Sequence, residues 1–322
     1  MKATLFDQPG DASALYFGDA PDPVPGSDEL LVRVHASALN RADILQRHGG
    51  YNPPPGASPI LGLELAGEVV QSAGDFVAGD RVMAVVTGGG YAELATVPAS
   101  MAMRIPDNLS YEQAAAIPEA FLTAYLNLFN LGNVEMGESV LIHAGGSGVG
   151  TAAIQLGKTA GAAVYTTSSA GKLQTCLDLG ADLAIDYKTE RFADRIREAT
   201  GGEGVNAILD FIGAPYWNDN LHVLKRGGRL VIIGLLGGVK GELDMGAILR
   251  KAITVTGTTL RPMPLPQKSA LTAAFSGYAL KLLEKGVLKP VIDRTFPLSE
   301  AAAAHRYMES NANTGKIVLA VR

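Results

Sequence analysis

A glycine-rich loop between an apolar run and an amphipathic run is the segment that most constrains the fold. Residues 139–144 read Ser-Val-Leu-Ile-His-Ala, which is typical of a buried strand, and Gly-Gly-Ser-Gly-Val-Gly follows at 145–150. Residues 149–160 have the apolar periodicity of a helix. A strand, a glycine loop and a helix in this order form the phosphate-binding turn of dinucleotide-binding domains, because the helix N-terminus supplies N–H groups and partial positive charge.

The glycines of this loop depart from the strict G-x-G-x-x-G spacing. That spacing needs glycine at 145, 147 and 150, and Ser147 interrupts it, whereas the overlapping pattern of Gly148, Gly150 and Ala153 is intact. A tight turn in an α/β domain that binds no ligand would also use glycines here. The strand before the loop and the strands and helices after it favour the dinucleotide site. Its candidate contacts in the loop are Gly145, Ser147, Gly148 and Val149.

The 322 residues suffice for two domains, and their pattern changes at two points. Residues 1–118 hold short apolar runs between Gly and Pro turns, which predicts a mostly antiparallel, barrel-like β domain. In residues 119–260, where a helix is expected at 120–131, β-branched runs alternate with amphipathic helices. This predicts parallel βαβ units in a doubly wound sheet and an α/β fold class. Residues 261–322 look like pieces that return to the first domain.

The end of the second strand of this repeat predicts which dinucleotide is bound. An NAD site usually has Asp or Glu there, about 20 residues past the loop, bonded to the ribose 2′-hydroxyl. This chain has no acid between Gly150 and Asp178; it has Ser169 and Lys172, with Tyr187 after the third strand. Hydroxyls and an ammonium favour a 2′-phosphate, which an acid would repel. We expect NADPH rather than NADH; the alternative for Lys172 is a solvated residue that opens a helix.

Composition excludes several classes of protein. Hydrophobic residues make up 47% and charged residues 18%, so a sizeable core is expected and disorder is not. The formal net charge is -5 without a run of Lys or Arg, which argues against a nucleic-acid partner. A single cysteine, Cys176, excludes an internal disulfide and a multi-cysteine metal site. The first residues read as a strand rather than a signal peptide, and no stretch approaches the roughly 18 apolar residues of a membrane span, so we expect a cytoplasmic protein without a membrane partner.

Several further segments resemble those of a known family. They are Leu61-Gly62-Leu63-Glu64 with Ala66-Gly67, residues 144–156 around the glycine loop, and Gly315-Lys316-Ile317-Val318. With them the chain resembles the medium-chain dehydrogenase/reductase superfamily, and its zeta-crystallin-like quinone oxidoreductases in particular. Residues 37–43, 51–58 and 116–120 are similar to the tumour-suppressor-inducible quinone oxidoreductase branch.

This resemblance implies a GroES-like catalytic domain made from both chain ends, a Rossmann domain between them and an active site in the cleft. It also implies homodimers joined edge to edge through the Rossmann sheets. The implied cofactor contacts are Asn40, Tyr51 and Thr123 at the nicotinamide, Gly148 and Val149 at the pyrophosphate, Ser169, Lys172 and Tyr187 at the 2′-phosphate, and Gly234, Leu260 and Lys316 along the cofactor.

Zinc-dependent members of the superfamily have a cysteine in the loop that corresponds to residues 37–43, and Gly-His-Glu in the loop that corresponds to residues 61–64. This chain has Asn40 in the former loop and Leu63 between Gly62 and Glu64 in the latter, and it lacks the superfamily's four-cysteine structural lobe. Because zinc prefers thiolate and imidazole ligands, we expect no catalytic zinc. The scattered histidines, expected to be structural or exposed, include His35, His48 and His143.

The expected reaction is hydride transfer from NADPH to a small electron-poor substrate, with a quinone as the first candidate. A quinone accepts hydride directly and its ring stabilises the resulting anion, so no metal is needed. We expect Asn40 and Tyr51 to be the catalytic residues. Tyr51 either gives a hydrogen bond or proton to the substrate oxygen or only packs against the nicotinamide. Asp43 and Arg41 are expected to pair structurally.

Two other functions fit the same sequence. An enoyl-thioester or enone reductase shares the fold and the hydride step, and activity on 2-enoyl-CoA but not on quinones would select it. An NADPH-binding sensor or structural protein would bind the cofactor tightly with little turnover. The sequence leaves the physiological substrate, the number of electrons moved per step and the oligomer count open.

Overall fold

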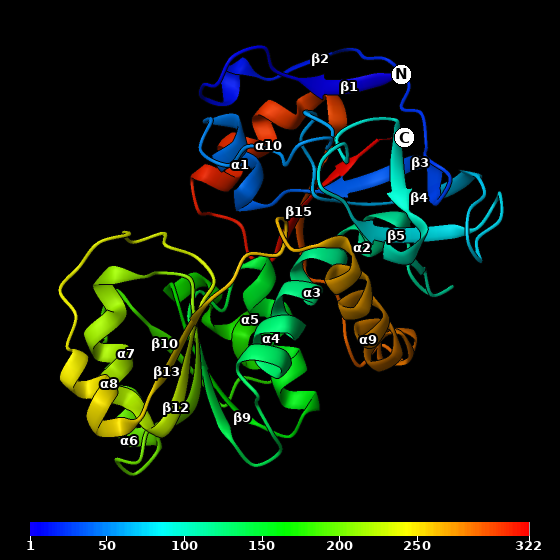
Figure 1. Cartoon of the computed structure of the whole chain (residues 1–322). Coiled ribbons are helices and arrows are strands. Elements are labelled where there is room, and N and C mark those ends of the chain that lie inside the picture. Colours follow the sequence, from blue (N-terminus) through cyan, green and yellow to red (C-terminus); the bar gives the residue numbers. More distant parts are fainter. Residues whose placement is uncertain (322) are drawn as a thin grey trace. The chain divides into compact units, whose positions relative to one another are not determined.

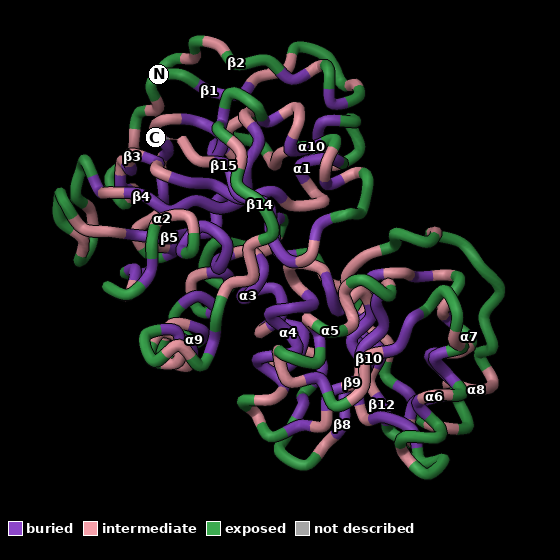
Figure 2. The backbone as a smooth tube through the Cα atoms, turned by 180° about the vertical axis from the view of Figure 1, so that it is seen from behind, coloured by how far each residue is buried: buried purple, intermediate pink, exposed green. Residues whose placement is uncertain are grey.

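The structure is a computed structural model that describes residues 1–321. The chain forms two compact units, one made of residues 1–122 with the chain from Arg261 onward, the other of Thr123–Leu260. Each unit has its own main sheet, and the central strands of both sheets are buried (Figure 2). The chain passes from the first unit to the second within helix α3 (Pro118–Tyr125).

The second unit is built on a six-stranded parallel sheet with helices on both faces (Figure 1). Its strands are β8 (Ser139–Ile142), β9 (Ala163–Ser168), β10 (Leu183–Asp186), β11 (Val205–Asp210), β12 (Leu224–Ile232) and β13 (Thr254–Gly257). Its helices are α4 (Gly148–Thr159), α5 (Leu173–Asp178), α6 (Phe192–Ala199), α7 (Trp217–Val223) and α8 (Met245–Lys251). The strand order β10-β9-β8-β11-β12-β13 places β8 beside the point where the winding reverses, which is the doubly wound dinucleotide-binding arrangement.

The β-branched and apolar character of these strands explains their burial. Leu141, Ile208 and Leu230 come from adjacent strands and are fully buried, and they pack against Ile196 of α6 and Leu221 of α7. Because both faces are covered by helices, the strands read as continuous apolar runs. The predicted α/β fold class is confirmed.

The first unit contains a seven-stranded sheet and a separate two-stranded sheet. Its strands are β1 (Lys2–Leu5), β2 (Tyr16–Asp19), β3 (Glu29–Ala38), β4 (Glu64–Gln71), β5 (Arg81–Val85), β6 (Leu94–Pro98), β7 (Ala102–Arg104), β14 (Ile292–Pro297) and β15 (Lys316–Ala320), and its further helices are α1 (Arg41–Arg47), α2 (Tyr111–Ala115), α9 (Leu265–Glu284) and α10 (Ala301–Glu309). All pairings are antiparallel except β14 with β15. Strand β15 pairs with β3, so the end of the chain completes the sheet that its beginning starts.

The helix predicted at residues 120–131 is wrong in its second half. Helix α3 ends at Tyr125 and continues as a π-helix, Leu126–Leu131. The side-chain amide of Asn127 donates to the carbonyl of Thr123 at 2.7 Å, which is the acceptor that a regular α-helix gives to a backbone N–H. The N–H of Gly132 then reaches the carbonyl of Asn127 at 2.9 Å, five residues back.

Among residues 1–321, no helix is long and apolar enough to cross a membrane.

Candidate active site

The glycine loop packs tightly against the strands that hold it. Ala144 adopts a positive φ of 52°, a conformation that a residue with a side chain rarely takes. A Cβ on Gly145 would lie 1.9 Å from Oγ1 of Thr166, and a Cβ on Gly150 would lie 2.3 Å from the carbonyl oxygen of Ala144. Glycine is therefore required at positions 145 and 150 by the loop's own packing.

Ser147, which interrupts the glycine spacing, is the N-cap of α4. Its Oγ accepts the N–H of Gly150 at 3.0 Å, so a side chain here stabilises the helix start. The N–H groups of Gly148 and Val149 are left without an acceptor among residues 1–321. Two free donors at the positive end of a 12-residue helix fit the oxygens of a pyrophosphate. The loop thus fits the phosphates of a dinucleotide.

The residues predicted for the ribose end lie together after β9 and β10. The N–H of Tyr187 donates to the carbonyl of Ser168 at 3.2 Å, which places Tyr187 beside the segment that carries Ser169. The stem of Lys172 crosses the glycine loop, since a Cβ on Gly146 would lie 2.7 Å from its Cδ. Tyr187 and Ser169 therefore lie close together in the chain's fold, and the stem of Lys172 lies against the glycine loop.

Three further residues predicted to contact the cofactor belong to this unit. Thr123 is buried at 8% exposure in α3, Gly234 follows β12, and Leu260 is the buried last residue of the unit. The N–H of Gly234 donates to the carbonyl of Asp210 at 3.3 Å. Their roles at a cofactor stay predictions.

In the first unit, Asn40 and Lys316 meet at a carboxylate that the sequence analysis gave no role. Glu64 is fully buried, and its Oε1 lies 2.7 Å from Nζ of Lys316 and 2.9 Å from Nδ2 of Asn40. Lys316 also donates to Oδ1 of Asn40 at 2.8 Å and to the carbonyl of Leu39 at 2.6 Å. These bonds fix the orientation of the Asn40 amide.

Asp43 and Arg41 do not pair, contrary to expectation. Asp43 is fully buried, where it accepts the N–H groups of Asn40 at 2.7 Å and Gly62 at 3.0 Å, while Arg41 donates to the carbonyl of Met308 at 2.9 Å. Burial raises the pKa of Asp43 to about 6, against the lowering effect of those two N–H groups. Asp43 acts instead as the cap that fixes the turn after Asn40.

Tyr51 belongs to a proline-rich loop that Arg261 holds. Arg261 donates to the carbonyl of Tyr51 at 3.1 Å and to that of Thr87 at 2.6 and 3.0 Å, with its guanidinium 5.3 Å from the centre of the Tyr51 ring. Burial raises the pKa of Tyr51, with Glu119 adding to the rise and Arg261 opposing it. The phenol is therefore neutral near pH 7, and its hydroxyl has no hydrogen-bond partner in the described chain.

The structure adds Glu64, Glu119 and Arg261 to the residues that the sequence predicted. The N–H of Glu119, in the first turn of α3, donates to Oε2 of Glu64 at 2.8 Å. Glu64 and Glu119 both lie in motifs that served only to recognise the family. An acidic residue within an apolar motif was the one signal in the sequence for a role at the site. Arg261 carried no signal, because its partners lie 174 and 210 residues away.

The three histidines have structural surroundings. His143 is fully buried and bonded to Oγ1 of Thr167 at 2.9 Å and to Oδ1 of Asn220 at 2.8 Å, and burial lowers its pKa to about 4. His35 stacks on Tyr111, and His48 contacts Arg47 on the surface of the first unit.

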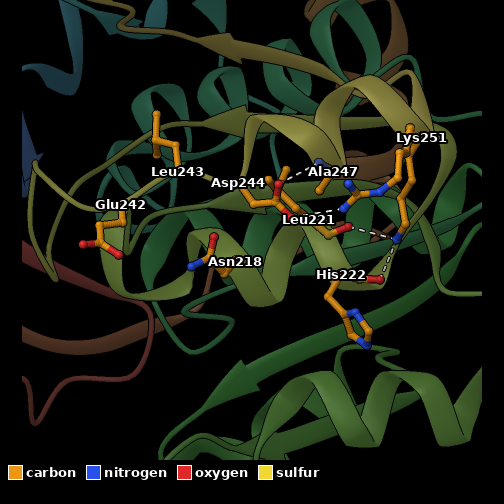
Figure 3. Close-up of a pocket in the computed structure, with 9 residues that line it drawn as sticks. Asn218, Leu221, His222, Glu242, Leu243, Asp244, Ala247 and Lys251 are labelled. Atoms are coloured by element: carbon orange, nitrogen blue, oxygen red, sulfur yellow. Dashed lines mark hydrogen bonds and ion pairs between the residues drawn. The ribbon is translucent and has the colours of Figure 1, made fainter.

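A pocket of about 480 Å³ in the second unit contains none of the predicted residues (Figure 3). Its walls are α7, α8 and the segment before α8. Lys251 donates to the carbonyls of Leu221, His222 and Leu224, and Arg250 pairs with Asp244 at 3.2 Å. Because both cations already have partners, the pocket is not a candidate for the reaction.

Comparisons with known proteins agree with this architecture. The alcohol dehydrogenase GroES-like domain matches residues 26–107, and the zinc-binding dehydrogenase family matches residues 179–319. The chain is 32% identical to the quinone oxidoreductase of Sus scrofa over 308 residues, covering 94% of this chain and 92% of that protein. It is 34% identical to the synaptic vesicle membrane protein VAT-1 homolog of Mus musculus over 322 residues, covering 93% and 78%.

Solved structures give the same result. An NAD-dependent alcohol dehydrogenase has a TM-score of 0.90 at 32% identity, covering 100% of both chains. The Escherichia coli quinone oxidoreductase complexed with NADPH has a TM-score of 0.89 at 30% identity, covering 99% of this chain and 100% of that one. The enoyl reductase CurK has a TM-score of 0.88 at 27% identity, covering 99% and 98%.

The fold and the glycine loop together define a dehydrogenase/reductase with a Rossmann-type unit. The chain belongs to the medium-chain dehydrogenase/reductase superfamily, among the relatives of its quinone oxidoreductases. The predicted membership is thereby confirmed, and the tumour-suppressor-inducible branch stays a prediction.

The zinc that one family name implies does not fit the residues present. The polar cluster at Asn40 contains an amide, carboxyl groups and Lys316, whose ammonium already occupies Oε1 of Glu64. No group of three or more His, Cys, Asp or Glu side chains suited to a metal occurs among residues 1–321. Zinc prefers thiolate and imidazole ligands, so this donor set suits a metal-free reaction.

Proposed function

We propose that this protein is a NADPH-dependent oxidoreductase that transfers a hydride to a quinone or a similar electron-poor small molecule. The observation that carries the proposal is the pair of free N–H groups at the start of α4 next to Lys172. The similarity to quinone oxidoreductases, one of them complexed with NADPH, supports it.

NADPH is preferred over NADH on the chemistry of the ribose end. Ser169, Lys172 and Tyr187 offer hydroxyl and ammonium donors, which suit a dianionic phosphate. The carboxylate at the end of β10, Asp186, turns into its own loop, where it accepts the N–H of Lys188 at 3.1 Å. One similar structure is an NAD-dependent enzyme, so these side chains, rather than the fold, support the choice.

When bound, NADPH supplies the hydride, and the protein's contribution is orientation and charge. Asn40, held by Glu64 and Lys316, presents a fixed amide. Tyr51, held through its main chain by Arg261, presents a neutral phenol. With Thr123, these residues are proposed to surround the reacting groups, and no metal is required.

The test is NADPH consumption by the purified protein with quinones, enones and 2-enoyl-CoA side by side. We expect quinones to be reduced fastest, and NADH to replace NADPH poorly. Activity confined to 2-enoyl-CoA would select an enoyl reductase, the second candidate, which the structural likeness to CurK favours. Tight NADPH binding without turnover of any acceptor would instead indicate a sensor or structural protein.

The proposal extends to a cytoplasmic homodimer. Cys176 is buried and unpaired, in keeping with a reducing compartment. Strand β13 forms an edge of the second unit's sheet, and such edges serve for pairing between copies of a chain.

A further inference from the structure

Reduction by hydride leaves a negative charge on the acceptor oxygen, and the proton that neutralises it needs a source. The cluster around Asn40 holds several groups that carry protons. Three of them are cationic: Lys316, Arg261 and Lys268. Their bonds decide which are free to act.

The cations of the cluster are engaged. The ammonium of Lys316 is shared among Glu64, Asn40 and the carbonyl of Leu39. Arg261 donates to the carbonyls of Thr87 and Tyr51, and Nζ of Lys268 donates to the carbonyl of Arg261 at 3.3 Å. A cation held in this way stabilises charge around it but is a poor proton donor, and an arginine stays protonated in proteins.

Two of the three carboxyl groups in the cluster are engaged as well. Glu64 is fully buried and accepts from Lys316, Asn40 and the N–H of Glu119. Asp43 is fully buried and accepts from the N–H groups of Asn40 and Gly62 and from the hydroxyl of Tyr91 at 3.3 Å. Both therefore serve as fixed acceptors.

Glu119 differs from both. It stands in the first turn of α3, after Pro118, and only its N–H is held by Glu64. Its carboxyl group has no hydrogen bond or ion pair in the part of the chain that the structure describes, and its side chain is half-buried rather than enclosed. A carboxyl group that has no hydrogen bond or counter-ion and lies near two other carboxylates favours its neutral, protonated form.

The surrounding charges agree with this reading. Burial raises the pKa of Glu119 to about 8, and the charges of Glu64 and Asp43 add to the rise, while Lys316 and Lys268 oppose it. Tyr51 and Arg261 also lie within electrostatic reach of this carboxyl. Glu119 is thus an acid that keeps its proton at neutral pH, whereas Tyr51 is made a weaker acid by the same surroundings.

We infer that Glu119 is the proton donor of the reaction, a role that rests on the function proposed above. The hydride brings two electrons and one proton to the acceptor, and a carbonyl oxygen of the acceptor gains the negative charge. The O–H bond of Glu119 breaks, its electron pair stays on the carboxylate, and the proton forms a new O–H bond on the acceptor. The carboxylate then regains a proton from water.

This assignment predicts a dependence on the acceptor. The anion of a reduced quinone is a weak base that is stable until it meets a proton in water, whereas the enolate from an enone is a stronger base that forms more easily when an acid stands beside it. Loss of the acid should therefore slow enones more than quinones. The protein would then be suited to α,β-unsaturated carbonyl compounds as well as quinones.

The test compares Glu119→Gln, which keeps the shape and loses the acidic proton, with Glu112→Gln, a matched change in the first turn of α2. For Glu119→Gln we expect enone turnover to fall by about 10²-fold, within the range for general acids, with the NADPH Kd unchanged. Parent turnover should fall as pH rises through about 8, because the acid loses its proton, and that fall should be absent from Glu119→Gln. Glu119→Asp should recover part of the turnover, and its turnover should again decline at alkaline pH.

A second measurement requires no activity. In protein labelled with carbon-13 at the glutamate carboxyls, one resonance should titrate near pH 8 and be missing from Glu119→Gln. Full enone turnover in Glu119→Gln with the alkaline fall intact, or a Glu119 resonance that titrates in the ordinary range of about 4, would overturn the inference while leaving the proposed function standing. A parent protein that reduces no acceptor would overturn the proposed function and the donor role together, whatever the titration shows.

Discussion

At the scale of single residues, Lys172 separates the two cofactors. Lys172→Glu places a negative charge where the 2′-phosphate is proposed to bind, so the NADPH Kd should rise at least about tenfold and the NADH Kd much less. The measurement is a titration of the parent and the variant with both cofactors. Lys281→Glu, an exposed change on α9, is the control. Equal weakening of both cofactors by Lys172→Glu would show that this lysine does not bind the phosphate.

Variants of Tyr51 distinguish a role in proton transfer from a role in packing against the cofactor. Tyr51→Phe removes a hydroxyl that has no partner within the described residues, and it keeps the ring beside Arg261. If Glu119 is the main acid, turnover should fall only a few-fold, below the about 10² to 10⁴ of a general acid. Tyr51→Ala should raise the NADPH Kd, because it removes the packing surface.

Turnover and cofactor titration of both Tyr51 variants distinguish the two roles. A hundred-fold fall of turnover in Tyr51→Phe, with NADPH affinity unchanged, would show that the phenol of Tyr51, and not Glu119, is the proton donor. A Phe variant with the turnover of the parent would leave Tyr51 as a packing residue.

The donors around Asn40 make a metal test simple. Because Lys316 already neutralises Glu64, and residues 1–321 contain no group of three or more His, Cys, Asp or Glu side chains suited to a metal, the purified protein should contain no stoichiometric zinc. Elemental analysis, and activity before and after a chelator, check this. Stoichiometric zinc lost in parallel with activity would contradict the metal-free assignment.

Part of the site could be predicted from sequence because its pieces are local. The glycine loop, its cap and the ribose-end residues lie within about forty positions of each other, on consecutive strands of a repeating pattern. The cluster at Asn40 is different, since its bond to Lys316 joins residues 276 positions apart. Only the family resemblance pointed to Asn40 and Lys316, and the position of Glu64 in an apolar motif did not indicate which residues it contacts.

At the scale of elements, α4 connects helix stability to phosphate binding through Ser147. Ser147→Ala removes the bond to the N–H of Gly150, and loss of such a cap costs about 1 kcal/mol. Ser147→Asp keeps a capping oxygen and adds a negative charge, so it should keep the parent's melting temperature but bind NADPH more weakly. Melting curves and NADPH titrations of both variants check this. Unchanged NADPH affinity in Ser147→Asp would show that the pyrophosphate does not bind at the α4 N-terminus.

Elements with strong periodic patterns were predictable, and short ones were not. Helix α4 begins and ends within one residue of the predicted range 149–160. Helices α1 and α8 have seven residues each, too few for a periodic signal. The π-helix after α3 follows a side-chain bond from Asn127 to the carbonyl of Thr123, which no periodicity could reveal.

At the scale of the whole molecule, strand β13 is the feature that bears on assembly. It pairs with β12 and with no further strand in the described chain, which leaves a row of backbone groups at the edge of the sheet. Large apolar side chains are also exposed on the chain between β12 and β13, among them Leu236 at 62%, Val239 at 71% and Leu249 at 83%. An unpaired edge in a unit that also exposes apolar residues suits a symmetric contact with a second copy.

The direction of the bonds in β13 supplies a specific test. The N–H of Thr258 reaches β12, and N–H directions alternate along a strand, so those of Val255 and Gly257 point to the open edge. Val255→Pro therefore removes an outward N–H and spares the bonds to β12. The parent should sediment as a dimer and Val255→Pro as a monomer that still binds NADPH, while Val255→Thr should stay dimeric. A parent that is monomeric would remove the dimer from the proposed function, and a dimeric proline variant would place the contact on another face.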